Sequence, residues 1–187
     1  MEKMLKNFVL YLHDKFGITP DILTYTRIFA APWLALLVSK SISSKSATTA
    51  LITMALYLLI VSTDFLDGIL ARNIPEHDHS HGGMLDRLSD KILIVFTLIP
   101  FGLNLFTFLI ILAESILAFQ AIYAPEDKKQ ATKTGKAKMV LQALLVPVLL
   151  IRVVTGFVPE IFFFAYIFCT IAFTYASIYS HYFYFEK

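Results

Sequence analysis

The chain has 187 residues, of which 57% are hydrophobic, 14% aromatic and 16% charged. Soluble domains average roughly 25% charged and 45–50% apolar residues, so this composition argues against a compact water-soluble protein. Sixteen Lys and Arg against fourteen Asp and Glu leave a formal net charge of only +2, which excludes the strongly basic balance of a dedicated nucleic-acid-binding protein.

Residues 1–19 are predicted to form an amphipathic helix that lies in the membrane interface. Such a helix buries its apolar face at the acyl boundary and keeps its lysines near anionic headgroups. Gly17 and Pro20 end it. The alternative is a short helix packed on another part of the protein. The apolar residues that recur at helical spacing are Leu5, Phe8, Val9, Leu12 and Phe16.

Residues 20–187 are predicted to form a bundle of six transmembrane helices, because a spanning helix needs about 20 mostly apolar residues. No cleavable signal peptide is expected, since mixed residues precede the first apolar stretch and further spans follow it. The predicted fold is therefore an all-α integral membrane protein with a single membrane domain, 1–187. The six spans are Ile22–Ser39, Ala47–Leu70, Met84–Leu103, Leu105–Ala124, Val140–Thr155 and Ile161–Tyr184.

Lysines gather on one side of the predicted bundle. Short cytoplasmic loops retain an excess of Lys and Arg. Both termini and the joint between the fourth and fifth spans are therefore predicted to face the cytoplasm, with the protein in the cytoplasmic membrane. The lysines that carry this prediction are Lys3, Lys6 and Lys15 before the first span, and Lys128, Lys129, Lys133, Lys136 and Lys138 in the joint.

Four aspartates stand at predicted membrane depth: Asp64 and Asp67 end the second span, and Asp86 and Asp90 begin the third. Acids there cost several kcal/mol each unless they are paired, hydrated or metal-bound, so they are candidate functional groups. Residues three or four apart share a helix face, which gives each span one carboxylate pair. Because only a joint of about 71–82 separates these spans, we expect antiparallel neighbours with both pairs in one cytoplasmic cavity.

Oxygen-only ligands of this kind suit hard divalent cations such as Mg²⁺ or Mn²⁺, which also bind substrate phosphates. The pattern therefore favours a metal-bound diphosphate, with one carboxylate left to accept a proton. Gly68 and Gly82 allow a close approach to the backbone, and Arg72 supplies a planar fork suited to phosphate. The alternative is that the aspartates cap helix ends or pair with basic neighbours, namely Arg72, Arg87 and Lys91.

The segment Asp64-Phe-Leu-Asp67-Gly68-Ile-Leu-Ala71-Arg72, then nine residues, then Gly82-Gly-Met-Leu-Asp86-Arg-Leu-Ser-Asp90 resembles the signature of the CDP-alcohol phosphotransferase family. All eight fixed positions of that signature are filled. The resemblance implies that a CDP-linked lipid such as CDP-diacylglycerol donates a phosphatidyl-type group to a small alcohol, releasing CMP, in phospholipid biosynthesis. It also implies a homodimer.

The resemblance assigns roles residue by residue. Two metal ions, Mg²⁺ or Mn²⁺, would be held by Asp64, Asp67 and Asp86, with Asp90 as a further ligand and the general base on the acceptor hydroxyl. The positions associated with the CDP moiety are Asp67, Gly68, Ala71, Arg72 and Gly82.

The sequence indicates the acceptor alcohol less specifically than it indicates the family. Pro20, Leu23, Thr24 and Arg27 resemble the entry segment of the phosphatidylglycerophosphate synthase branch, and the segment from Gly135 to Gln142 resembles another of its segments. Both favour glycerol 3-phosphate. Against this, an Arg-Glu pair usual in that branch is replaced by Ala113-Glu114. Inositol phosphate and phosphatidylglycerol therefore stay open as acceptors.

A phosphorylated acceptor needs cationic partners, and lysine is an adequate phosphate binder. The candidates are Lys133, Lys136, Lys138 and Arg27; the alternative role of the lysines is attraction to anionic headgroups. Residues 77–81, rich in histidine, are predicted to form a solvated loop. Glu114 has no predicted partner.

Two other classes of protein use membrane-associated carboxylates. A metal-dependent prenyltransferase would require two Asp-rich motifs on distant helices, whereas this chain has one contiguous set. A transporter or ion pathway would spread ionisable groups through the membrane depth, whereas here they gather at one edge.

Overall fold

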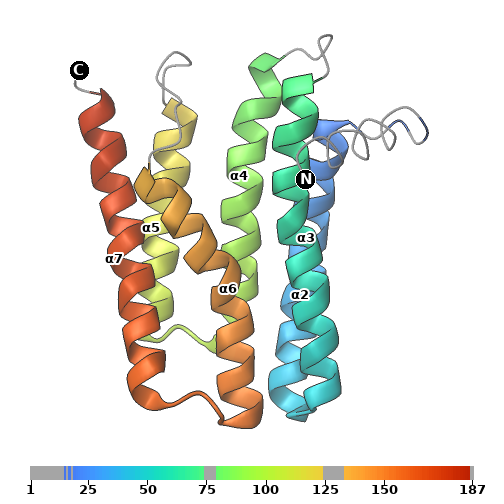
Figure 1. Ribbon diagram of the computed structural model, residues 1–187, viewed down its shortest axis with the longest axis vertical. Coiled ribbons are helices and arrows are strands. Elements are labelled where there is room, and N and C mark those ends of the chain that lie inside the picture. Colours follow the sequence, from blue (N-terminus) through green and yellow to red (C-terminus); the bar gives the residue numbers. More distant parts are fainter. Residues whose placement is uncertain (1–14, 16, 18, 74–78, 124–132, 186–187) are drawn as a thin grey trace.

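The computed structural model describes residues 15, 17, 19–73, 79–123 and 133–185. All regular structure in this part of the chain is helical, as predicted. Figure 1 shows helices that run alternately up and down in one bundle. The interfacial helix predicted for residues 1–19 falls almost wholly outside the described residues. The elements are α2 (Pro20–Ser44), α3 (Ala47–Asn73), α4 (His79–Leu98), the 3₁₀ turn η1 (Ile99–Phe101), α5 (Leu105–Tyr123), α6 (Lys133–Thr155) and α7 (Glu160–Phe185).

Five of the six described α-helices, namely α2, α3, α5, α6 and α7, are long and apolar enough to cross a membrane. They correspond to five of the six predicted spans. The sixth, predicted at Met84–Leu103, overlaps α4, which lies inside the bundle but has four charged residues between Asp86 and Lys91. By composition alone α4 therefore does not qualify as a span.

Several helices extend beyond the apolar stretches that predicted them. α3 continues to Asn73, α4 begins at His79, and α6 begins at Lys133 instead of Val140. Hydropathy marks the apolar part of a helix, whereas the helical hydrogen bonds continue through polar residues until a cap or a breaker ends them. The loop prediction for residues 77–81 is accordingly wrong for His79 and His81, which lie in the first turn of α4; residues 77 and 78 lie outside the described part.

α2 begins as its sequence predicts. Pro20 occupies the first turn, where a missing N–H costs nothing, and the Thr19 hydroxyl accepts a hydrogen bond from the Ile22 N–H at 3.4 Å. Gly17, just before this cap, has φ +63°, a backbone conformation that favours glycine. Because the first residue of α2 is fixed in this way, the direction in which each later side chain of the helix points is fixed too.

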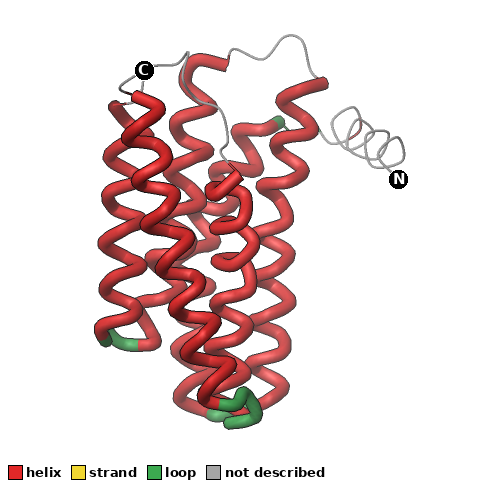
Figure 2. Tube along the Cα trace, turned by 60° about the vertical axis from the view of Figure 1, so that its left-hand side comes forward, coloured by secondary structure: helices red, strands yellow, loops and turns green. Residues whose placement is uncertain are grey.

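α2 lies at the centre of the site half of the bundle, where it packs against both α3 and α4. α3 and α4 run antiparallel, as predicted (Figure 1), but they make few direct contacts with each other in the described residues because α2 lies between them. On the other side, α5 packs on α4 and α7, and α6 packs on α7 and α3. Figure 2 shows the same helices side by side, with short described loops at the lower end of the bundle.

The core between the helices is apolar and includes the fully buried Tyr57, Leu98, Leu145 and Leu150. Large apolar side chains also cover the outside of the bundle; the Trp33 side chain, for example, is 70% exposed. Such an outward apolar surface is what acyl chains cover in a membrane protein. α6 contains Pro147 and changes direction along its length (Figure 1), as a proline inside a helix causes.

Candidate active site

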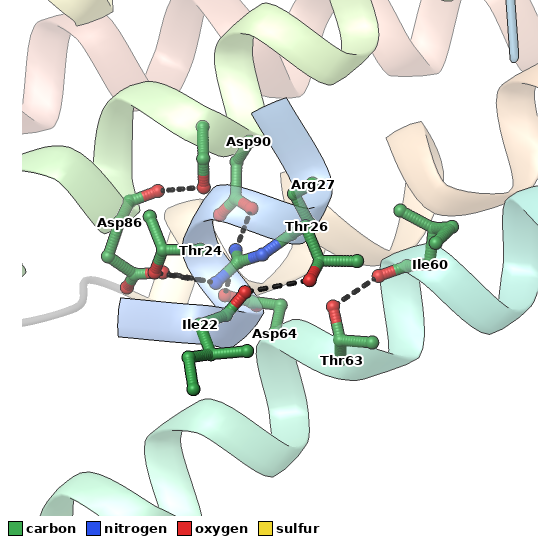
Figure 3. Close-up of polar contacts among 10 residues, drawn as sticks. Ile22, Thr24, Thr26, Arg27, Ile60, Thr63, Asp64, Asp86 and Asp90 are labelled. Carbon is green, nitrogen blue, oxygen red and sulfur yellow. Dashed lines mark hydrogen bonds and ion pairs between the residues drawn. The ribbon is translucent and has the colours of Figure 1, made fainter. Parts of the chain in front are cut away.

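Three of the four signature aspartates converge on one arginine. Arg27, on α2, reaches Asp64 of α3 through Nη1 at 3.0 Å and Asp86 of α4 through Nη2 at 2.5 Å (Figure 3). Its Nη1 also contacts Asp90 of α4. Asp86 and Asp90 are four residues apart, so they project from the same face of α4. The central position of α2 thus brings the carboxylates of α3 and α4 to a common point.

The arginine side of the cluster is buried, whereas its carboxylate side is partly exposed. The Arg27 side chain is 0% exposed, whereas the side chains of Asp64, Asp86 and Asp90 are 28%, 35% and 30% exposed. The carboxylates therefore form the accessible rim, and the guanidinium lies behind them. α3 continues for nine residues past Asp64, about 13 Å at 1.5 Å per residue, so the rim is recessed from the end of the bundle.

Buried hydroxyl groups surround the cluster. Thr24, on the same helix as Arg27, has its Oγ1 3.5 Å from Nη2. Thr63 donates to the Ile60 carbonyl and Ser89 to the Asp86 carbonyl, both at 2.7 Å. Both hydroxyls are thus satisfied within their own helices and do not occupy the aspartate oxygens.

A second buried cluster joins α5, α6 and α7. The Glu114 carboxylate accepts from Lys138 Nζ at 2.8 Å on Oε1 and at 3.0 Å on Oε2, and from Gln142 Nε2 at 2.6 Å. Gln142 Nε2 also lies 3.4 Å from Thr174 Oγ1. Glu114 is 1% exposed and Lys138 8% exposed. Glu114, for which the sequence suggested no partner, therefore has a basic partner and an amide partner.

Tyr57 connects the two clusters. It lies on α3, two turns before Asp64, and its hydroxyl donates to the Gln142 backbone carbonyl at 3.3 Å. Gln142 belongs to the second cluster through its side chain. A single fully buried tyrosine thus bridges the helix that carries the acidic rim and the helix that carries Lys138.

The remaining signature residues lie on the same two helices as the aspartates. Asp67, Gly68, Ala71 and Arg72 occupy the last turns of α3, and Gly82 lies near the start of α4. Their side chains fall outside the described part of the chain. The roles predicted for them toward metal and the CDP moiety accordingly stay predictions.

The lysines predicted to bind an acceptor phosphate differ in their surroundings. Lys136 is exposed near the start of α6, whereas Lys138, one half-turn later, is turned inward to Glu114. Lys133 is the first residue of α6, and its side chain lies outside the described part. Arg27, the fourth candidate, is occupied by carboxylates.

Sequence reasoning missed Arg27 as the partner of the aspartates and named Arg72, Arg87 and Lys91 instead. A signal was present: Arg27 is a cation inside an apolar stretch, and such a residue is expected to pair with an acid at the same depth. The same rule applied to Glu114 points to a lysine or arginine of another helix.

The donor set suits a hard divalent cation. The three aspartates offer only carboxylate oxygens, the ligands that Mg²⁺ and Mn²⁺ prefer, and they already converge on a positive group. Three ionised carboxylates against one guanidinium leave a formal charge of −2. In the described residues no three Asp, Glu, His or Cys side chains are arranged to hold an ion as they stand; the three carboxylates instead contact the Arg27 guanidinium.

Residues 17–176 match the protein family described as CDP-alcohol phosphatidyltransferase. The chain therefore belongs to the CDP-alcohol phosphatidyltransferase family of phospholipid-synthesising enzymes, as its signature predicted. Over 143 residues it is 27% identical to a CDP-diacylglycerol–glycerol-3-phosphate 3-phosphatidyltransferase of Cereibacter sphaeroides, an alignment that covers 70% of this chain and 62% of that relative. The chain thus matches less than two thirds of the relative's length. No solved structure matches the chain.

Proposed function

We propose that the protein transfers a phosphatidyl-type group from CDP-diacylglycerol to glycerol 3-phosphate and releases CMP. The observation that carries the proposal is the convergence of Asp64, Asp86 and Asp90 in a recessed, half-open cluster within a chain of this family. The acceptor is supported by the Cereibacter sphaeroides relative and by the similarity of the segments around Arg27 and Lys136.

Each carboxylate has a proposed task. Asp64, Asp67, Asp86 and Asp90 hold two divalent ions, Mg²⁺ or Mn²⁺, which neutralise the diphosphate charge and assist the departure of CMP. Asp90 accepts the proton of the acceptor hydroxyl as that oxygen bonds to the lipid-linked phosphorus and the bond to CMP breaks. Gly68, Ala71, Arg72 and Gly82, together with Asp67, line the position of the CDP moiety.

The acceptor phosphate is assigned to lysines of α6. Lys136 is exposed near the start of α6, which favours it as a partner for an anion that arrives from solution, and Lys133, the first residue of the helix, is the second candidate. Lys138 and Arg27 are weaker candidates because each is already held by buried carboxylates. An anion that approached Arg27 would first have to pass three aspartates.

We also propose that α4 crosses the membrane as a sixth span. Its aspartates Asp86 and Asp90 pair with Arg27 of α2, and the part of the helix after Lys91 has no charged residue. The lysines before the first span and around the start of α6 favour an orientation with both termini and the site on the cytoplasmic side. A homodimer, as the family resemblance implies, completes the proposal.

The test is CMP release by the purified full chain in lipid nanodiscs. The reaction contains CDP-diacylglycerol, Mg²⁺ or Mn²⁺, and one acceptor: glycerol 3-phosphate, an inositol phosphate or phosphatidylglycerol. We expect CMP with glycerol 3-phosphate and none when the divalent ion is chelated. CMP with another acceptor alone would replace the acceptor but keep the chemistry. Absence of CMP with every acceptor would overturn the proposed function.

A variant tests the metal assignment separately. Replacing Asp64 with alanine should raise the Mg²⁺ concentration required for half-maximal CMP release, because one carboxylate ligand is lost. Glu160→Gln is the matched control, since Glu160 is an acid at the opposite end of the bundle with a 75% exposed side chain. An unchanged Mg²⁺ requirement in the Asp64 variant would contradict the assignment.

A further inference from the structure

Arg27 is buried against three aspartates, and the proposed reaction does not require an arginine there. Its guanidinium is 0% exposed and contacts the Oδ1 atoms of three aspartates that come from two helices. A residue that binds an anionic substrate presents its charge to the cavity, whereas Arg27 lies behind the acids. Its contacts are those of a cation that neutralises carboxylates.

We infer that Arg27 is a resident counter-ion of the acidic cluster, which holds Asp64, Asp86 and Asp90 together before a divalent ion binds and competes with that ion for the same oxygens. Arg27 is thus a positioning residue that sets the affinity of the site for divalent cations. This inference rests on the proposed function, because it takes the aspartates as the metal ligands.

The contacts indicate that Arg27 competes with the divalent ion for the aspartates and does more than hold them in place. All three contacts use the Oδ1 atom of an aspartate, so an ion held by these acids lies beside a guanidinium whose positive charge repels it. The carboxylates then share their negative charge between the guanidinium and the ion, so the contacts to Arg27 weaken when an ion binds. The carboxylates are about one third exposed, so the ion approaches from the open rim while Arg27 stays behind it.

The charges explain why such a residue is needed. Three carboxylates in one cluster repel each other strongly in a partly buried environment. Without a cation, they would protonate or turn apart, and the site would have to be rebuilt at every turnover. A guanidinium, with donors in a fixed planar fork, can hold two carboxylates at separate nitrogens, which an ammonium point charge does less well.

The experiment compares Mn²⁺ binding in wild type and Arg27→Gln, measured by electron paramagnetic resonance of free Mn²⁺ on the full chain in nanodiscs, without substrates. Removing one positive charge next to a divalent ion should lower the Kd for Mn²⁺ by about tenfold or more. The variant should also unfold at a lower temperature without Mn²⁺ and gain a larger thermal shift when Mn²⁺ is added.

Two further variants make the result specific. Arg27→Lys, which keeps the charge but loses the fork, should have a Kd between those of wild type and Arg27→Gln, and it serves as the test if the Gln variant fails to fold. Arg152→Gln removes an arginine of α6 that pairs with Glu160 at the other end of the bundle, and it should leave Mn²⁺ affinity unchanged.

The outcomes separate this inference from the proposed function. An equal or weaker affinity for Mn²⁺ in both Arg27 variants overturns the counter-ion role, even if wild type releases CMP as proposed. Tighter Mn²⁺ binding in Arg27→Gln supports the role whether or not the acceptor is glycerol 3-phosphate. A wild-type chain that binds no Mn²⁺ and releases no CMP overturns both.

Discussion

The two buried ionic clusters described above differ in charge. In the cluster of α5, α6 and α7, one Glu114 carboxylate meets one Lys138 ammonium, and Gln142 and Thr174 complete the hydrogen bonds. In the cluster of α2, α3 and α4, one Arg27 guanidinium faces three carboxylates. The first is neutral and nearly sealed, whereas the second carries excess negative charge and has an open rim.

This difference separates stability from function. A charge that is buried with a matched partner stays as it is, because nothing further is required to satisfy it. An unmatched set of carboxylates is costly unless another cation binds there for at least part of the time. We therefore expect the Arg27 cluster to be the place where ligands enter, and the Lys138 cluster to be a fixed tie between helices. The following variants test that distinction.

The largest effect is expected on turnover from Asp90→Asn. The amide keeps the shape of the side chain but cannot accept the hydroxyl proton, so CMP release should fall by about 10²- to 10⁴-fold. The fold should survive, since Arg27 retains Asp64 and Asp86 as partners. Activity close to that of wild type would exclude Asp90 as the base. It would also contradict the view that the Arg27 cluster is catalytic and the Lys138 cluster structural.

The next largest effect is expected on stability from Glu114→Gln. It leaves the Lys138 ammonium buried without its counter-charge, which should cost roughly 3–5 kcal/mol in the free energy of unfolding. Unfolding in detergent, followed by circular dichroism, measures it. The double variant Glu114→Gln with Lys138→Met should recover most of the loss. A single variant as stable as wild type would indicate that this cluster does not tie the helices.

A smaller effect is expected from Tyr57→Phe, which removes the hydroxyl that donates to the Gln142 carbonyl. One neutral hydrogen bond contributes about 0.5–1.5 kcal/mol. Because Tyr57 bridges the clusters, its loss should also be non-additive with Glu114→Gln in a double-mutant cycle. Tyr166→Phe, which removes a bond to the Leu141 carbonyl, is the matched control, and strict additivity for Tyr57 would refute the bridge.

The smallest effect is expected from Glu160→Gln. This acid pairs with Arg152 at 3.1 Å, but its side chain is 75% exposed, and exposed ion pairs contribute about 0–1 kcal/mol. Arg152 also donates to the Val158 carbonyl and lies over the Phe163 ring, so it stays in place. Neither turnover nor the unfolding temperature should change by more than the experimental scatter.

The sequence was sufficient to predict the helical fold and the convergence of Asp64, Asp86 and Asp90, because both depend on patterns within one or two helices. The spacing of Asp86 and Asp90 places both on one face, whatever else the chain does. By contrast, the insertion of α2 between α3 and α4 depends on how all the helices pack. A linear pattern contains no such information, and Arg27 was for that reason assigned to a substrate and not to the aspartates.

The pairing of Glu114 with Lys138 was missed for a related reason. These residues are 24 positions apart and belong to different helices, so no spacing rule joins them. The lysine was instead grouped with its exposed neighbours, such as Lys136, because they share a segment. Whether a lysine of α6 points into the bundle or outward depends on how the helix is rotated about its own axis, and the sequence does not give that rotation.

Helix α6 has a weak point at Pro147, which supplies no N–H and leaves the carbonyl one turn earlier without its usual donor. Just ahead of that turn, the hydroxyls of Tyr57 on α3 and Tyr166 on α7 donate to the carbonyls of residues 142 and 141. Two neighbouring helices therefore anchor α6 immediately before the position where its own hydrogen bonding is interrupted, which ties its lysine-bearing half to the rest of the bundle.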